Sequence, residues 1–129
     1  MEENLITKGD AFSPLALAFL GDAVFEIYIR KHILTKANTS VNNLHKKTVK
    51  FVKASAQCDA FDKIESYLTD KEIRIFKRGR NAKINTKAKN AALSEYKKAT
   101  GFEALLGYLY INGDLSRLEE LLKMSADFE

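Results

Sequence analysis

The sequence predicts an all-α protein that folds as a single domain. Apolar residues recur at helical spacing along most of the chain, and no segment shows the alternation bounded by turn residues that is typical of strands. A length of 129 residues fits one domain with a real core and leaves little room for a second. A nearly all-apolar run at 15–29, LALAFLGDAVFEIYI, predicts a helix buried at the centre of that domain. We therefore expect residues 1–129 to form one domain.

The composition indicates a globular protein that works inside the cell. Hydrophobic residues make up 46% of the chain and charged residues 29%, which is an ordinary globular balance. The single cysteine, Cys58, excludes an internal disulfide and a cysteine-rich zinc site, and it suits a reducing cytoplasm. The first ten residues lack the layout of a signal peptide, and the apolar run at 15–29 is too short and too charged to span a membrane. We expect a cytoplasmic protein with no membrane contact.

Polar residues mark where the first helices should begin and end. Ser13 and Pro14 predict the start of the central helix, because Ser can cap free N–H groups and Pro suits the first turn. A polar break at 35–39 ends that helix, and Ser40 can cap a second helix with apolar positions from 41 to 55. The residues at 57–59 are interpreted as a junction before a further helix.

The second half of the chain contains one aperiodic segment between two helical ones. Residues 69–72, TDKE, form a capping-box pattern that opens a short helix. Residues 77–90, KRGRNAKINTKAKN, interrupt the periodicity and are predicted to be a loop or a frayed helix end. Helical spacing resumes at Ser94 and continues through the apolar segment 102–111, and Asp114 should cap a last helix.

The two most apolar predicted helices each carry acidic residues in their interior. Asp22 and Glu26 lie four residues apart in the first, and Glu103 lies in the second. Such helices should pack together, with Gly21 and Gly107 allowing a close approach. Facing carboxylates repel unless a cation lies between them, and neither helix interior holds a Lys or Arg. A hard cation such as Mg²⁺ is one explanation, and satisfaction of each acid by a nearby basic side chain or helix end is the other.

Positive charge is concentrated in one part of the chain. Residues 69–98 hold ten Lys or Arg against three acids, whereas the other residues are slightly acidic. This concentration predicts a surface that binds a polyanion. Arg78 and Arg80 flank Gly79 in the aperiodic segment, where a loop could present their guanidinium groups to phosphates. The alternative is an ordinary solvated helix face.

Two motifs resemble those of the ribonuclease III family. FLGDAVFE at 19–26 resembles the signature of that family, and FEALLG at 102–107 is similar to its second acidic motif. Their order, separation and helical setting also match, so the resemblance covers nearly the whole chain. It implies an all-α, dimeric endonuclease domain that cuts double-stranded RNA with magnesium. It also implies that Asp22 and Glu103 hold the metal and carry catalysis.

Two positions depart from the usual family pattern. The family's first motif has a glutamate where this chain has Ala18, and its second has an aspartate where this chain has Thr100. The reduced acidic set, and the absence of a second RNA-binding domain from these 129 residues, resemble the Mini-ribonuclease III subfamily. That resemblance implies a bacterial, cytoplasmic homodimer that matures the 23S ribosomal RNA precursor. The nuclease domain must then grip RNA itself, and the candidates are Lys77, Arg78, Arg80, Asn81, Lys83, Lys87 and Lys89.

Two other functions remain open at this point. The chain could be a non-catalytic helical RNA-binding module, such as a ribosome-assembly factor, in which the acids are structural. It could also be a metal-free ribonuclease that uses its two histidines, His32 and His45, as acid and base. Glu26, near Asp22 on the same helix, could either orient Asp22 or form a structural ion pair.

Overall fold

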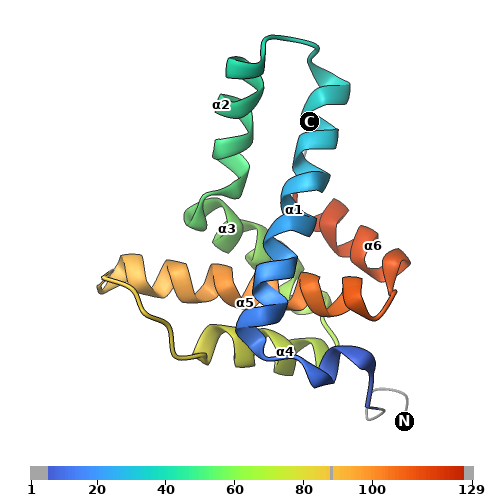
Figure 1. The fold of residues 1–129 in the computed structure, drawn as a ribbon, viewed down its shortest axis with the longest axis vertical. Coiled ribbons are helices and arrows are strands. Elements are labelled where there is room, and N and C mark those ends of the chain that lie inside the picture. The colour runs from blue at the N-terminus through green and yellow to red at the C-terminus, as the bar shows by residue number, and fades with distance from the viewer. Residues whose placement is uncertain (1–5, 88, 127–129) are drawn as a thin grey trace.

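The computed structural model describes residues 6–87 and 89–126, and every regular element in that part of the chain is a helix. The all-α prediction is therefore confirmed. No helix within these residues is long and apolar enough to cross a membrane. The elements, shown in Figure 1, are η2 (Lys8–Ala11), α1 (Pro14–Lys36), α2 (Val41–Val52), α3 (Ala54–Ile64), η3 (Glu65–Tyr67), α4 (Asp70–Asn81), α5 (Ala91–Ile111) and α6 (Leu115–Ser125).

Helix α5 is the hub of the fold. In Figure 1 it runs horizontally, with α1 crossing it, α4 running beside it, and α1 and α2 forming an upright hairpin. The core on which these helices close contains four buried phenylalanines. The rings of Phe25 and Phe102 meet edge to face at 5.4 Å between centroids, and those of Phe61 and Phe76 stack at 3.8 Å. Phe61 also meets Phe102 edge to face at 6.5 Å, so these contacts connect α1, α3 and α4 to α5 in the main core cluster.

Helices α1 and α5 touch backbone to backbone at two glycines. A Cβ placed on Gly21 would lie 1.7 Å from the carbonyl oxygen of Glu103, and one placed on Gly107 would lie 1.9 Å from that of Leu17. Any side chain at either position would therefore force the two helices apart. The prediction that these glycines allow a close approach is confirmed.

The local start signals of three helices are also confirmed. Ser13, Ser40 and Thr69 each occupy an N-cap position, and each hydroxyl accepts a hydrogen bond from the backbone N–H three residues further on. At α4 the Glu72 carboxylate also accepts from the backbone N–H of Thr69, which completes the predicted capping box. Asp114 occupies the N-cap position of α6, but its side chain makes no capping hydrogen bond.

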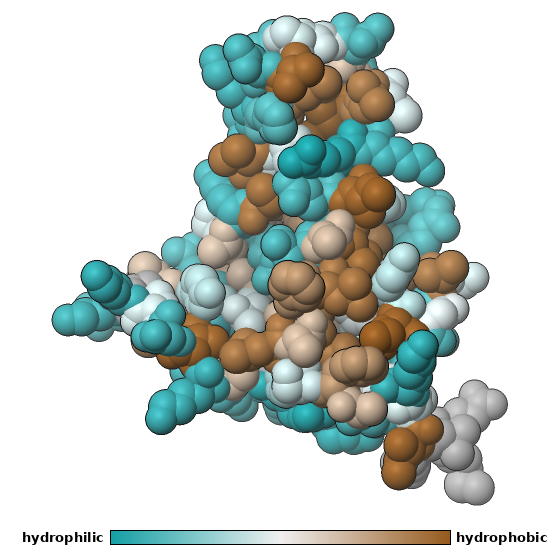
Figure 2. All heavy atoms as spheres, viewed as in Figure 1, coloured by the Kyte–Doolittle hydropathy of each residue, from teal (hydrophilic) through white to brown (hydrophobic). Residues whose placement is uncertain are grey.

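The central helix differs from its prediction in length and in burial. Helix α1 continues to Lys36, and it is not buried all round. The side chain of Phe19 is 83% exposed and that of Ile27 is 70% exposed, whereas Leu17 and Val24 are buried. Figure 2 shows apolar residues gathered over the middle of the face where α1 crosses α5. The prediction of a fully buried helix is therefore wrong on one side.

Two predicted breaks lie inside helices. The residues at 57–59 are part of α3, and the break before them is at Lys53, whose backbone is extended. The segment 77–81 forms the last turns of α4, so of the predicted loop or frayed helix end the first part is a helix end. Gly79 is buried against α5, and a Cβ on it would lie only 2.9 Å from the Cα of Gly101. The helix therefore needs a glycine at this position. Among the described residues the non-helical connection consists of 82–87, 89 and 90, and α5 begins three residues before Ser94.

The segment before α1 is fastened to α5 and α4 by a polar cluster. The hydroxyls of Thr7 and Tyr108 are 2.7 Å apart, and the Lys71 ammonium lies 2.9 Å from the Asp10 carboxylate. The hydrogen bonds from Thr7 and Lys71 hold the pKa of Asp10 below its ordinary value. The hydroxyl of Tyr108 is thus used in this cluster, with Thr7 and Asp10.

The glycine crossing yields a stability prediction. Gly21→Ala should lower the free energy of unfolding by about 3 kcal/mol or more, the upper part of the range for overpacking, because the atoms in the way are backbone. Urea denaturation followed by far-UV circular dichroism measures this loss. As a control, Gly113→Ala should cost only about 1 kcal/mol, from its positive φ, because no atom lies within 4 Å of the added Cβ. Equal stability of Gly21→Ala and wild type would contradict the crossing.

Candidate active site

The glycine crossing places the two predicted catalytic acids side by side. Gly21 of α1 lies against the backbone of Glu103, so the next residue, Asp22, lies beside the Glu103 side chain. The two carboxyl groups are close enough to share a hydrogen bond. Asp22 is exposed and Glu103 is half-buried, so the pair opens to solvent from the Asp22 side.

The Glu103 carboxyl group keeps its proton at neutral pH. Burial and then the neighbouring Asp22 carboxyl group together raise its pKa to about 8, while a hydrogen bond from Gln57 acts in the opposite direction. Among the described residues, no Lys, Arg or His forms an ion pair with Asp22 or Glu103. The alternative in which basic side chains satisfy these acids is therefore not what the structure shows.

Gln57 belongs to the site although the sequence analysis placed it in a junction. Its side chain projects from α3 and is only 3% exposed, and its Nε2 donates to Oε2 of Glu103 over 3.3 Å. A signal for it exists in the sequence. Gln57 shares a helical face with the core residues Phe61 and Ile64, and a polar residue at an apolar position has to find a buried partner.

Glu26 is paired outside the carboxyl pair. Its carboxylate lies 2.9 Å from the guanidinium of Arg30, one turn further along α1. Both side chains are largely accessible, so this is a surface ion pair. The structural interpretation of Glu26 is the one that the contacts favour. The hydroxyl of Thr100, at one of the positions where the family usually has an acid, donates to the Tyr96 carbonyl at 2.9 Å and supplies no charge.

The carboxyl pair fits a hard divalent cation. Within the described residues no group of three or more His, Cys, Asp or Glu side chains could hold a metal. Mg²⁺, however, commonly keeps several waters and takes only one or two protein carboxylates. A carboxyl group whose pKa is raised by burial and by a second acid, with no basic partner, is one that a cation would deprotonate and stabilise. Asp22 and Glu103 are the residues that would hold it.

The predicted basic residues gather around one end of the α4–α5 pair. Lys77 and Arg78 are exposed on the last turns of α4, and Arg80 is half-buried beside them. The remaining candidates are exposed and lie at the end of α4 or in the connection 82–90, namely Asn81, Lys83, Lys87 and Lys89. They lie in one region of the fold, although those on α4 project to different sides of that helix and do not form the single loop that the sequence suggested.

Helical geometry separates the two arginines. Successive residues of an α-helix are rotated by about 100°, so Arg78 and Arg80 project to nearly opposite sides of the buried Gly79. Arg78 lies on the same side as Lys71, which contacts Asp10 just before α1. Arg80 instead has its guanidinium 5.6 Å from the ring centre of Phe76, on the side of α4 that faces α3. Only Arg78 therefore shares the side of α4 on which α1 lies.

The family of the chain follows from comparison with known proteins. A model of the ribonuclease III domain matches residues 15–114, which include both acidic motifs. The Mini-ribonuclease 3 of Clostridium tetani is 54% identical over 92% of this chain and 80% of its own length. That of a Thermoanaerobacter species is 50% identical over 95% and 87% of the two lengths.

A solved structure shows the same fold. The crystal structure of a protein from Fusobacterium nucleatum is 33% identical to this chain, covers 87% of it and 89% of its own length, and superposes with a TM-score of 0.79. Family model, relatives and fold agree, and the paired carboxyl groups of α1 and α5 lie inside the matched region. The chain therefore belongs to the ribonuclease III family and is an endoribonuclease of that type.

Proposed function

We propose that this endoribonuclease cleaves double-stranded RNA with Mg²⁺, and that Asp22 and Glu103 are its catalytic, metal-binding residues. The observation that carries the proposal is the carboxyl pair itself, which two glycines hold together although no described basic residue compensates it. We also propose the 23S ribosomal RNA precursor as the RNA and the cytoplasm as the place where it is cut, because the acidic motifs resemble those of the Mini-ribonuclease III subfamily.

Each side chain of the site has a separate task in this reaction. When bound, the metal would stabilise negative charge on the phosphate and on the leaving oxygen and would lower the pKa of a water. Asp22, which is exposed, and Glu103 would hold the cation from opposite helices. Glu103 would have to be ionised to do so, and a nearby cation would favour its ionised form. Gln57 donates to Oε2 of Glu103 and so fixes the orientation of the carboxylate.

The RNA would lie across the face that carries the carboxyl pair. A-form RNA hides its bases in a deep and narrow groove, so phosphate contacts dominate its recognition. Arg78 lies on the α1 side of α4, is exposed, and forms no ion pair with an acid among the described residues. We assign to it the strongest phosphate contact of the basic region, with the exposed lysines of the connection 82–90 extending the contact.

We further propose that two copies of the chain pair through the exposed apolar side of α1. Phe19 is 83% exposed and Ile27 is 70% exposed, and a groove of about 430 Å³ beside Ile27 is lined largely by apolar residues of α1, α5 and α6. A patch of this kind on a folded protein marks an interaction surface (Figure 2). A second copy is the occupant we propose, because Asp22 lies three residues from Phe19. Pairing would then bring two carboxyl pairs to one RNA-binding face.

The catalytic assignment is tested with Asp22→Asn on a double-stranded RNA. Wild type should cut with Mg²⁺ and stop when a chelator is added, and Asp22→Asn should cut more than about a hundredfold slower, because the carboxylate that holds the cation is lost. Gel analysis of the products measures both rates. Asp59→Asn, an exposed aspartate on α3, is the matched control and should cut normally.

The same assay separates the alternatives. Cutting that persists in the chelator would favour the two histidines as acid and base. Binding of RNA without cutting in Mg²⁺ would favour a non-catalytic module. Asp22→Asn cutting at the wild-type rate would refute the assignment of Asp22.

The pKa of Glu103 predicts how the metal-free protein responds to pH. In the unfolded chain this group ionises near 4.5, whereas in the folded protein it keeps its proton up to about pH 8. Between these values the folded state binds more protons, so the contribution of Glu103 to stability falls as the pH rises. Glu103→Gln should therefore gain in Tm over wild type, by several degrees, between pH 5 and pH 8 in chelator. Glu26→Gln is the control and should show no such gain.

Differential scanning fluorimetry over that pH range provides the measurement. Gln57→Leu should extend the fall in stability to higher pH, because the hydrogen bond that favours the ionised form of Glu103 is removed. A constant difference between Glu103→Gln and wild type at all pH values would show that the Glu103 carboxyl group is not perturbed.

The phosphate contact of Arg78 predicts a change in salt dependence. Arg78→Ala should weaken the binding of duplex RNA in chelator and reduce the slope of log affinity against log salt by about 0.9, on the calibration for duplex DNA. Fluorescence anisotropy with a labelled duplex measures the slope. Lys123→Ala removes an exposed charge on α6 and should leave it unchanged. If Arg78→Ala keeps the full slope, the RNA surface lies elsewhere, with Lys46, Lys47, Lys50 and Lys53 as the next candidates.

The pairing surface is tested with Phe19→Asp. A buried charge at the centre of an apolar interface should convert the dimer into a monomer, which sedimentation velocity detects. Val49→Asp, which places the same charge on an exposed apolar residue of α2, should leave the dimer intact. A wild-type protein that sediments as a monomer at all concentrations would contradict the proposal.

A further inference from the structure

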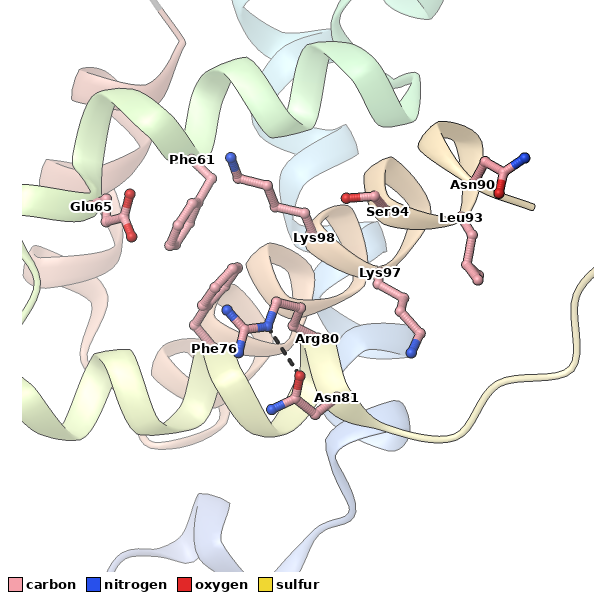
Figure 3. A pocket seen from close by; sticks show the side chains of 10 residues that line it. All are labelled: Phe61, Glu65, Phe76, Arg80, Asn81, Asn90, Leu93, Ser94, Lys97 and Lys98. Carbon is pink, nitrogen blue, oxygen red and sulfur yellow. Dashed lines mark hydrogen bonds between the residues drawn. The ribbon is translucent and has the colours of Figure 1, made fainter. Parts of the chain in front are cut away.

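A polar pocket lies between α3, α4 and the first half of α5. It has a volume of about 670 Å³, which is within the range of pockets that hold small molecules. Figure 3 shows its side chains. Phe61 of α3 and Phe76 of α4 face each other at one end, and Arg80, Lys97 and Lys98 surround the opening. None of the residues proposed for catalysis lines this pocket.

The pocket carries more positive charge than its acids neutralise. Lys98 forms an ion pair with Asp62, and Glu65 is the one acid that lines the pocket. Arg80 uses its Nε to donate to Oδ1 of Asn81 at 3.1 Å. Neither Arg80 nor Lys97 forms an ion pair with an acid among the described residues. Two half-buried cations are thus available to a ligand.

Neutral donors and an apolar wall complete the pocket. Asn90 and Ser94 contribute an amide and a hydroxyl at the start of α5, and the Asn90 side chain is not used to cap that helix. Phe61, Phe76 and Leu93 provide apolar surface next to these polar groups. A guanidinium, an ammonium and neutral donors suit a phosphate, and the adjoining apolar wall suits the sugar or base attached to it.

The position of the pocket separates it from the carboxyl pair. Ser94 and Glu103 are nine residues apart on α5, which is two and a half turns, so their side chains leave the helix on opposite sides. Gly101, on the pocket side, packs against Phe76 of α4. A ligand in the pocket therefore has α5 between itself and the acidic residues.

We propose that this pocket is a binding site for a nucleotide phosphate, with Arg80 and Lys97 as its cationic contacts. The phosphate can come from a free nucleotide or from an RNA strand that extends past the end of α4. The proposal goes beyond RNA cleavage, because the site lies on the other side of α5 and its occupation does not involve the carboxyl pair.

Isothermal titration calorimetry in chelator tests the site without any contribution from cleavage. The probes are AMP, adenosine, inorganic phosphate and a blunt RNA duplex, added to the full chain. AMP should bind more tightly than adenosine, because only AMP carries the phosphate. Lys97→Ala should weaken AMP binding about tenfold through the loss of one charged contact. Lys97→Gln should weaken it similarly, and Lys123→Ala, the matched charge removal on α6, should leave it unchanged.

The RNA duplex distinguishes the two sources of phosphate. If Lys97→Ala weakens the binding of AMP and leaves the duplex unaffected, the site takes a free nucleotide. If the same substitution weakens the duplex about tenfold, the site takes an RNA strand. Both outcomes support the pocket as a phosphate site. Absence of any binding of AMP, phosphate or RNA that depends on Lys97 overturns it, whether or not the enzyme cleaves RNA.

Discussion

The contact on which the rest of the structure depends is the backbone crossing of α1 and α5. Gly21 and Gly107 leave no room for a side chain between the helices, which meet backbone to backbone at this point. Asp22 follows Gly21 directly, and Glu103 supplies the carbonyl group that Gly21 touches. One contact thus determines both the packing of the two most apolar helices and the meeting of the two carboxyl groups. A shift of one residue along either helix would lose both.

The pairing of Glu103 with Asp22 lowers the stability of the metal-free protein. Bringing the Glu103 carboxyl group into a partly buried position beside Asp22 is unfavourable without a cation, and the raised pKa of Glu103 is the direct expression of that cost. Packing elsewhere offsets it, through the phenylalanines of the core and the ion pair between Glu72 and Arg117 that joins α4 to α6. A fully compensated pair would be more stable and would have no reason to take up a metal.

The features that the sequence predicted well are those that local chemistry determines. The caps at Ser13, Ser40 and Thr69 depend on residues at most three positions apart, and the glycines of the crossing were recognisable because each lies in an otherwise apolar helix. The two acids could be identified for the same reason, because a carboxylate in an apolar run needs a partner. The break at Lys53 could not be predicted, because the sequence around Lys53 contains neither Gly nor Pro.

The errors arose where tertiary contacts decide. Gly79 in a basic run looks like a loop residue, and only the contact with Gly101 shows why a helix needs a glycine there. The exposed side of α1 could not be told from a buried one, because its apolar residues have the same composition as a surface that packs on the core. Gln57 was missed because its partner lies 46 residues away.

Helix α5 also determines how the positive charge of the chain is divided. Its side facing α1 carries Glu103, and its opposite side carries Ser94 and Lys98. Helix α4 packs against this opposite side at Gly101. Gly79 of α4 is buried against α5. Because successive helix residues are rotated by about 100°, Arg78 and Arg80 on either side of Gly79 must project to nearly opposite sides of α4. A basic run that reads as one patch in the sequence therefore becomes two surfaces in the fold. The orientation of α4 about the Gly79 contact, more than the number of positive charges, decides which basic residues lie on the side of α4 that faces α1.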